Sequence, residues 1–324
     1  MKKITFILSL LFTLSTQAAI LHVGIGPAYP YNDLSDAYDA ASDGDTLKVN
    51  SGNWGGLSIY KPITIIGTGY FLEENQTNSA NDNGAIFSSI GLYAGSEGSR
   101  LIGLYCLSSI VLNFTSNIGV RRCTASYIYI INSDNVIVEN NYYVGSAFSE
   151  VRNSSNILLN NNYYNNLKIK SDSYAIIKNN TIEALSSASY NSTILNNIIL
   201  NASSFIFSVG NNNTISHNII RATANPSTSN PDNNNNYFVD YEVESVCIGY
   251  PEQGDYSPDA RWQLAPNSPA IGAADDGGDC GMYGGATPYI LSGLPPQPII
   301  YELNVPLNAD PAGLNVNLKA KTNN

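Results

Sequence analysis

The chain has 324 residues and a formal net charge of −11, and only 13% of its residues are charged, which is about half the usual fraction. It contains no basic cluster that would release enough counterions to hold nucleic acid, so the composition excludes that class of partner. Uncharged polar residues must therefore supply most of the solvated surface.

The first residues have the pattern of a secretory signal. Lys2 and Lys3 precede an apolar stretch from Ile4 to Leu14, and small residues follow, which places the signal at residues 1–18. This stretch is too short to span a bilayer, and no later one is long enough. We expect an exported bacterial protein, secreted or at the cell surface. Removing the two lysines from 15 basic residues leaves 13 against 26 acidic ones, a net charge of −13.

A short helix is predicted after the signal. Apolar residues share one helical face between positions 34 and 41: Leu34, Ala37, Tyr38 and Ala41. Asn32 or Asp33 is placed to cap its N-terminus. Because a solenoid must shield its open end, we expect this helix to lie there as a cap.

The middle of the chain repeats a short aliphatic segment that ends in asparagine. The last asparagines of the blocks are spaced by 21, 18, 17 and 21 residues: Asn141, Asn162, Asn180, Asn197 and Asn218. A period near 20 with one strand per repeat is typical of a solenoid, here of roughly ten to twelve coils. Asparagine tolerates the left-handed angles of a tight bend, and stacked coils lie about 4.8 Å apart. Asparagines in register can therefore pass amide hydrogen bonds along the stack.

Two regions carry a resemblance to a known family. Gly44-Asp45-Thr46 and Val49-Asn50-Ser51-Gly52 resemble the opening of pectin-lyase-like right-handed parallel β-helices. Later segments are similar to the closing coils of secreted members: Tyr237-Phe238-Val239-Asp240, Trp262-Gln263-Leu264, Ser268-Pro269-Ala270-Ile271-Gly272 and Cys280-Gly281-Met282-Tyr283-Gly284-Gly285. The resemblance implies an all-β, right-handed parallel β-helix solenoid with an N-terminal capping helix over residues 19–290. It implies little about activity, because this fold hosts several enzyme classes and non-enzymes.

Residues 291–324 are predicted to follow the solenoid as a Pro-rich bridge and a C-terminal β-hairpin. The alternating segments Ile299 to Val305 and Leu314 to Lys319 are joined by turn residues at 308–313. We expect the hairpin to pack on the side or end of the solenoid, and an independent sorting module is the alternative.

Four cysteines in an exported chain allow two disulfides. Cys106 and Cys123 are 17 residues apart and are predicted to take the bend position on neighbouring coils, either as a disulfide or as stacked free thiols. Cys247 and Cys280 flank the predicted last coils. No cysteine or histidine has the spacing of a zinc site, so we expect no metal of that kind.

The candidate ligand-binding surface is a charged cluster on two neighbouring coils. Aligning the coils on their asparagines stacks Tyr129, Glu150 and Lys168 in one outward column and places Arg152 beside Lys170 in another. One interpretation is a surface salt bridge from Glu150 to Lys168. The other is a groove for polysaccharide or a cell-surface glycan, to which further tyrosines would add flat rings: Tyr142, Tyr143, Tyr163 and Tyr164.

Catalytic residues are not assigned. A lyase would need a base such as Lys168 or Lys170 and a cation to neutralise the substrate carboxylate. Asp172 and Glu183 are expected near the charged cluster, and Glu150 with Asp172 is the only outward carboxylate pair for an inverting hydrolase. Polygalacturonase-type motifs do not occur at the expected coils. The alternatives are therefore a glycan-contacting protein, a non-catalytic structural or adhesive surface protein, and a polysaccharide lyase or hydrolase with an unrecognised site.

Cofactors are not expected, apart from a structural calcium ion. Asp275, Asp276 and Asp279, interleaved with glycines, are candidate calcium ligands, although a tight terminal turn uses the same residue types. We expect a monomer without a membrane span.

Overall fold

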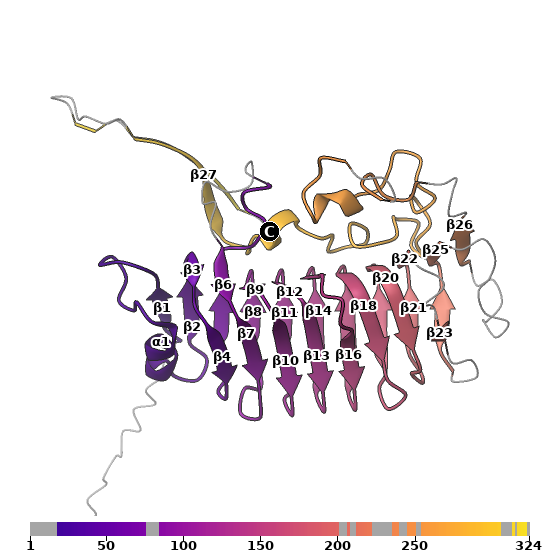
Figure 1. Ribbon diagram of the computed structural model, residues 1–324, viewed down its shortest axis with the longest axis horizontal. Coiled ribbons are helices and arrows are strands. Elements are labelled where there is room, and N and C mark those ends of the chain that lie inside the picture. The colour runs from indigo at the N-terminus through magenta and orange to yellow at the C-terminus, as the bar shows by residue number, and fades with distance from the viewer. Residues whose placement is uncertain are drawn as a thin grey trace, which may run out of the picture.

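The computed structural model describes residues 18–75, 84–200, 206–207, 212–221, 235–239, 245–250, 254–305, 313–314 and 316–322. It is a parallel β-solenoid in which strands make up 43% of the described residues and helices 5% (Figure 1). This confirms the predicted all-β fold class. Residues 1–17 of the predicted signal lie outside the described ranges.

One parallel sheet of ten strands, here called sheet A, runs along the solenoid. Its strands are hydrogen-bonded in chain order: β1 (Ile20–Val23), β2 (Thr46–Val49), β5 (Thr64–Ile66), β8 (Arg100–Ile102), β11 (Gly119–Arg121), β14 (Asp134–Glu139), β17 (Ser155–Asn160), β19 (Ala175–Lys178), β21 (Thr193–Leu195) and β24 (Thr214–Ser216).

A second parallel sheet, sheet B, has sixteen strands in two limbs, and the long strands β18 (Tyr163–Ile169) and β20 (Thr181–Ser187) run through both. The Asn-side limb contains β3 (Gly52–Asn53), β6 (Ala85–Phe87), β9 (Tyr105–Cys106), β12 (Thr124–Ala125), β15 (Tyr142–Tyr143), β22 (Ile198–Ile199), β25 (Ile219–Arg221) and β26 (Tyr237–Val239). The far limb contains β4 (Gly56–Ile59), β7 (Ser89–Leu92), β10 (Ser109–Asn113), β13 (Tyr127–Ile131), β16 (Ser149–Arg152) and β23 (Ile206–Phe207).

A ladder of buried asparagines joins sheet A to the Asn-side limb. The Oδ1 atom of Asn162 accepts from both the backbone N and the Nδ2 of Asn141, each at 2.9 Å. The Nδ2 of Asn162 donates in turn to Val138 O at 2.9 Å and to Asn180 Oδ1 at 3.1 Å. The same pattern continues through Asn197 and Asn218. The predicted ladder and its register are confirmed.

The residue before each ladder asparagine makes the bend itself. Asn140, Asn161, Asn179 and Asn196 have φ values of 59°, 53°, 52° and 59°. The sequence analysis assigned bend and ladder to the same asparagine, whereas the structure divides the two roles between neighbours. The first takes the left-handed conformation, and the second directs its amide inward.

A second ladder, made of hydroxyl groups, lies at the bend between the far limb and sheet A. The hydroxyls of Ser96 and Thr115 are 3.0 Å apart, and the backbone N–H of Ser133 donates to Ser154 Oγ at 3.1 Å. Ser154 N donates to Ser173 Oγ at 3.2 Å. All five side chains are buried. The sequence analysis did not predict this ladder.

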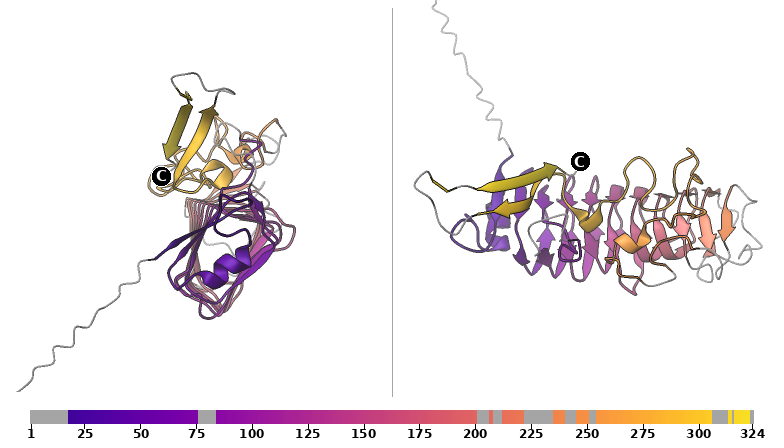
Figure 2. Two further views of the ribbon diagram at one scale, coloured as in Figure 1. Left: turned by 90° about the vertical axis from the view of Figure 1, so that its left-hand side faces the viewer. Right: turned by 90° about the horizontal axis from the view of Figure 1, so that it is seen from above.

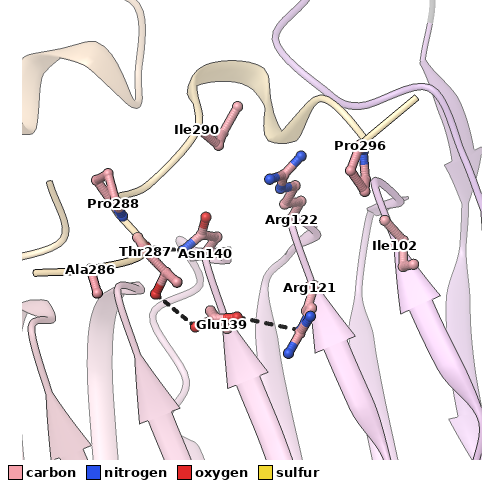
Figure 3. A pocket seen from close by; sticks show the side chains of 10 residues that line it. All are labelled: Ile102, Arg121, Arg122, Glu139, Asn140, Ala286, Thr287, Pro288, Ile290 and Pro296. Atoms are coloured by element: carbon pink, nitrogen blue, oxygen red, sulfur yellow. Dashed lines mark hydrogen bonds and ion pairs between the residues drawn. The ribbon is translucent and has the colours of Figure 1, made fainter. Parts of the chain in front are cut away.

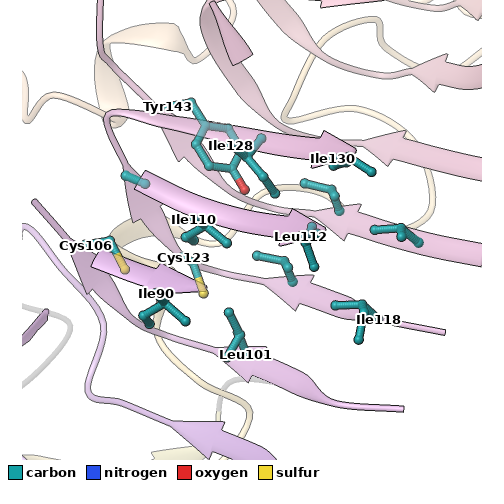
Figure 4. Packing of buried hydrophobic residues seen from close by; sticks show 14 of the residues in the cluster. Ile90, Leu101, Cys106, Ile110, Leu112, Ile118, Cys123, Ile128, Ile130 and Tyr143 are labelled. Carbon is teal, nitrogen blue, oxygen red and sulfur yellow. The ribbon is translucent and has the colours of Figure 1, made fainter. Parts of the chain in front are cut away.

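The space between the sheets is filled by an apolar column that includes two cysteines (Figure 4). Cys123 is at the ladder position as predicted, because its backbone N–H donates to Asn141 Oδ1 at 2.8 Å. Cys106 is not, since it lies opposite Phe87 and one residue after Tyr105, which aligns with Thr124. The coil step at this point is 19 residues, not 17. All four cysteines are buried and free.

The predicted N-terminal helix is present as α1 (Leu34–Ala40). The carboxylate of Asp33 accepts from the backbone N–H groups of Ser35 and Asp36 at 2.7 and 3.2 Å, as expected for an N-cap. Leu34 and Ala37 are buried in the main core, and the helix lies across the N-terminal end of the solenoid (Figure 2).

Residues 254–297, here called the return segment, form no coil and run back along the Asn-side edge (Figures 1 and 2). The outward amides of the bend asparagines hold it. Asn196 Nδ2 donates to Asp275 Oδ1 at 2.7 Å, and Asn161 Nδ2 donates to the backbone oxygens of Met282 and Gly284 at 2.9 and 2.6 Å. The expectation that these residues close the solenoid as coils was wrong. The solenoid accordingly has about eight turns, fewer than the ten to twelve expected.

A buried carboxylate, that of Asp259, ties together the two short 3-10 helices of the return segment, η3 (Ala260–Trp262) and η4 (Leu291–Gly293). Asp259 accepts from Ser292 N at 2.7 Å, from Ser257 Oγ at 2.9 Å and from Asn75 Nδ2 at 3.1 Å. Trp262 stacks on Tyr163 with ring centroids 4.6 Å apart. The return segment is therefore packed onto the solenoid by both polar and aromatic contacts.

The C-terminal strands β27 (Pro298–Asn304) and β28 (Asn317–Thr322) pair antiparallel. The first begins and ends one residue earlier than predicted, and the second begins and ends three residues later. Most of the turn predicted at 308–313 lies outside the described residues. Within the described ranges, no helix is long and apolar enough to cross a membrane.

We expect Asn162→Ala to lower the free energy of unfolding by about 2–5 kcal/mol. The change removes the acceptor of Asn141 N–H and the donor to Val138 O, and each buried polar group left unpaired costs about 1–3 kcal/mol. Urea unfolding would measure this. Asn166→Ala is the control, because its amide makes one contact near the surface, with Ser146 O at 3.1 Å, and should cost less than about 1 kcal/mol. An equal loss of unfolding free energy in the two variants would contradict a stabilising role for the ladder.

We also expect stability to fall at alkaline pH. Burial raises the pKa of the Cys123, Cys247 and Cys280 thiols to about 12, and burial also raises the pKa of Cys106. In the unfolded chain thiols ionise near 8.5, so above about pH 8.5 the unfolded state releases protons that the folded state keeps. The stabilisation that the protonated buried thiols give the folded state is complete below about pH 8.5 and is lost as the pH rises towards 12. Urea unfolding from pH 7 to 11 would detect the decline, and a flat profile would contradict it.

Candidate functional site

The structure places the predicted surface residues in the expected register on the far limb. Tyr129 on β13 is directly opposite Glu150 on β16, and Glu150 is opposite Lys168 on β18. Arg152 is opposite Ile131, and Lys170 follows the end of β18. Four of the five predicted residues therefore lie on three neighbouring strands of one sheet face, and Lys170 lies one residue beyond the third strand.

The ionic contacts differ from the predicted salt bridge. Glu150 lies between Arg152 and Lys170, with Oε1 3.8 Å from Arg152 Nη1 and Oε2 3.7 Å from Lys170 Nζ. Lys168 Nζ instead lies 5.4 Å from the centroid of the Phe148 ring. Arg152 and Lys170 thus share one carboxylate rather than facing each other unneutralised. Three cations and one anion leave the cluster with a local charge of +2.

Four tyrosines that were predicted to supply sugar-stacking rings are buried: Tyr142, Tyr143, Tyr163 and Tyr164. They follow the ladder asparagines on the Asn-side limb rather than lying on the far limb. Tyr142 and Tyr163 stack on each other at 4.5 Å beneath the return segment, while Tyr143 and Tyr164 stack at 5.2 Å within the core. This part of the predicted groove is wrong.

Other tyrosines lie on the same face as the charged cluster. Tyr60 and Tyr93 stack with ring centroids 5.2 Å apart, and Tyr127 lies 4.8 Å from Tyr129. The alternation of outward and buried residues along each strand is the sequence signal that would have found them. Together with the charged cluster they form what we call the tyrosine face: Tyr60, Tyr93, Tyr127, Tyr129, Glu150, Arg152, Lys168 and Lys170.

The tyrosine rings lie close to the sheet. A side chain at Gly91 would collide with the ring of Tyr93, so the absence of a Cβ there allows this ring to lie over the strand. Partial burial, followed by the nearby Tyr127 and Glu150, raises the pKa of Tyr129. Its hydroxyl therefore remains protonated and able to donate a hydrogen bond.

The remaining acidic candidates make structural contacts. Asp172 accepts from Asn153 N at 3.0 Å, and Glu183 accepts from the Tyr163 hydroxyl at 2.7 Å. Asp275, Asp276 and Asp279 accept from Asn196 Nδ2, Gly278 N and Gly272 N, which are contacts of turns and of the return segment. In the part of the chain that the structure describes, no group of three or more potential metal ligands is found.

A pocket of about 320 Å³ lies between the solenoid and the return segment (Figure 3). Its polar residues come from the ends of β11 and β14 and from the return segment: Arg121, Arg122, Glu139, Asn140 and Thr287. Its apolar walls are Ile102, Ala286, Pro288, Ile290 and Pro296. This pocket is not among the predicted sites, although the step from Cys123 to Asn141 also places Arg121 opposite Glu139.

A carboxylate organises the polar side of the pocket. Glu139 Oε2 lies 3.4 Å from Arg121 Nε, and Glu139 Oε1 accepts from Thr287 Oγ1 at 2.8 Å and from Asn160 Nδ2 at 2.9 Å. Arg122 Nη1 donates to Leu294 O at 2.9 Å. Burial, followed by the charge of Arg121, lowers the pKa of the Arg122 guanidinium.

Arg122 occupies the bend position that asparagine takes in five later coils and His217 takes in one. Its φ of 54° is left-handed, a conformation that costs a residue with a Cβ roughly 1–2 kcal/mol. Arg122 combines this left-handed backbone with a side chain that lines the pocket.

No protein-family model matches this chain, and no curated protein matches it. The resemblance to pectin-lyase-like proteins therefore remains a prediction beyond the β-solenoid fold that the structure shows.

We expect Glu150→Gln to lower the free energy of unfolding by less than about 1 kcal/mol. Arg152 and Lys170 are 46% and 37% exposed in their side chains, so water and salt screen their attraction to Glu150. The difference from the native chain should shrink in 1 M salt, where the Debye length is about 3 Å. A loss of several kcal/mol in urea unfolding would mean that the cluster is part of what holds the fold together.

Proposed function

We propose that the protein is an exported bacterial β-solenoid, related to the pectin-lyase-like family, that binds polysaccharide along the tyrosine face. The export and family parts rest on the signal-like residues 1–18 and on the motifs of the sequence. We assign no catalytic residue. Binding is the part of the proposal that the side chains of the far limb support.

The observation that carries the proposal is the alignment of two tyrosine pairs and a charged cluster on one outward sheet face. Aromatic rings offer flat apolar area with a polar edge, and Arg152, Lys168 and Glu150 offer donors and acceptors for hydroxyl groups. Tyr60 is 59% exposed, so its ring is accessible. Such a mixture suits a ligand with apolar ring faces and hydroxyl edges, as a glycan has.

The length of the face favours a polymer over a single sugar. From Tyr60 beside β4 to Lys168 on β18 there are five strand steps, which at about 4.8 Å each amount to roughly 24 Å. The return segment runs along the other limb and leaves this face uncovered (Figure 2). An extended chain can therefore lie across several coils.

The test is binding of the purified full chain to an array of neutral and uronic-acid glycans, followed by product analysis on every hit. Tyr60→Ala should weaken binding of a hit about tenfold, as expected for loss of about 1.4 kcal/mol of ring contact. The double change Arg152→Ala and Lys168→Ala should weaken it about tenfold to a hundredfold, because hydrogen bonds to charged groups contribute about 1.5–3 kcal/mol each.

Tyr190→Ala is the matched control, since this tyrosine is 49% exposed in a turn outside the tyrosine face. Cleaved products would identify a lyase or hydrolase whose catalytic groups lie on this face. Absence of binding across plant, algal and bacterial glycans would favour a structural or adhesive surface protein and overturn the proposal.

A further inference from the structure

The pocket beneath the return segment has the dimensions of a small-ligand site and lies on the limb opposite the tyrosine face. Its volume of about 320 Å³ is at the lower end of the range for ligand pockets and equals the liquid volume of roughly ten water molecules. A molecule of about nine or ten non-hydrogen atoms fits this space. We propose that it binds a small organic monocarboxylate with an apolar body.

The charges of the pocket favour a single negative charge. Arg121 and Arg122 contribute two cations, and Glu139 contributes one anion that contacts Arg121, so the local charge is +1. The side chain of Arg121 is 51% exposed, which leaves it accessible from solvent. A guanidinium matches the planar geometry of a carboxylate. A doubly charged phosphate would exceed the local positive charge.

The remaining walls favour an apolar body on that ligand. Ile102, Ile290 and the two prolines Pro288 and Pro296 face the pocket from opposite sides in Figure 3. Arg122 and Asn140 lie between these apolar residues, and the Asn140 amide already donates to Thr287 O at 2.9 Å. The apolar residues are thus assigned to the body of the ligand, and the guanidinium between them to its carboxylate.

The backbone at Arg122 is a second and independent observation. Five later coils place asparagine at this bend, at low cost, and one places His217 there, whereas Arg122 adopts the left-handed conformation at φ 54° with a longer side chain. The guanidinium at this position is therefore kept against the local preference of the bend. Its presence next to Arg121 is what makes the pocket cationic.

The experiment is a titration of the full-length protein with sodium benzoate, which has nine non-hydrogen atoms, followed by calorimetry and saturation-transfer NMR. We expect a dissociation constant of about 1 mM or below. Benzamide, which is neutral and has the same shape, and inorganic phosphate should each bind at least tenfold more weakly. Equal binding of benzoate and benzamide, or tighter binding of phosphate, would overturn the monocarboxylate assignment.

Arg122→Asn is the informative variant, because it installs the residue that later coils use at this bend while it removes the guanidinium. Benzoate binding should fall at least tenfold with the fold retained. Should this variant unfold, Arg121→Gln at the exposed cation gives a second test and should weaken binding severalfold.

Glu139→Gln supplies a test of opposite sign. It raises the local charge from +1 to +2 and keeps an oxygen for Thr287 and Asn160, so benzoate should bind severalfold more tightly. Lys48→Asn is the control, since this exposed cation on β2 lies outside both the pocket and the tyrosine face, and it should leave benzoate binding unchanged. The proposal would be overturned if the native chain did not bind benzoate, or if none of the three pocket variants changed the affinity. The contact of Arg122 with Leu294 O would then be its structural role.

Discussion

The fold depends on the need to satisfy buried amides at a bend that recurs in every coil. When a parallel coil turns inward, it buries backbone N–H and C=O groups that the sheet ladders do not reach, and an unpaired group is costly there. The ladder asparagines satisfy both kinds, since each Oδ1 accepts from a neighbouring coil and each Nδ2 reaches a backbone oxygen. From Cys123 to Asn236, the spacing of the asparagines thereby fixes how successive coils stack.

The separation of the bend and ladder roles between two adjacent asparagines has a further structural consequence. With the second asparagine turned inward, the amide of the first is turned outward and can bind another segment. The return segment uses these outward amides along the edge of the solenoid. Where Arg122 replaces the bend asparagine, the contact is instead made by a guanidinium to Leu294 O, and the space that remains beside it is the pocket.

Much of the solenoid follows from local sequence, because its contacts repeat at a fixed period. That period was sufficient to predict the ladder and to place Tyr129, Glu150 and Lys168 side by side. It was not sufficient for contacts set by side-chain direction: Glu150 binds Arg152 and Lys170, while Lys168 turns to Phe148. The register of a column determines which residues are neighbours but not which rotamers they adopt.

The return segment was beyond local prediction, because its partners lie far away in sequence. Asp259 meets Asn75 across 184 positions, and Asn140 meets Thr287 across 147. No period relates such pairs, so residues 254–297 were mistaken for coils, and tyrosines that they cover, such as Tyr142 and Tyr163, were mistaken for exposed rings. The same error hid the pocket, since half of its wall belongs to the return segment.

The two limbs of sheet B are consequently under different constraints. On the Asn-side limb, outward residues must fit the return segment, which leaves little freedom except at the pocket. On the far limb, outward residues need only be compatible with a strand. The hydroxyl ladder at the neighbouring bend, made by Ser133, Ser154 and Ser173, accepts from the buried backbone N–H groups there, and it uses no residue of the tyrosine face. A binding surface can therefore change on the far limb without disturbing either ladder. This is the physical reason to look for an extended ligand there and for a small one beneath the return segment.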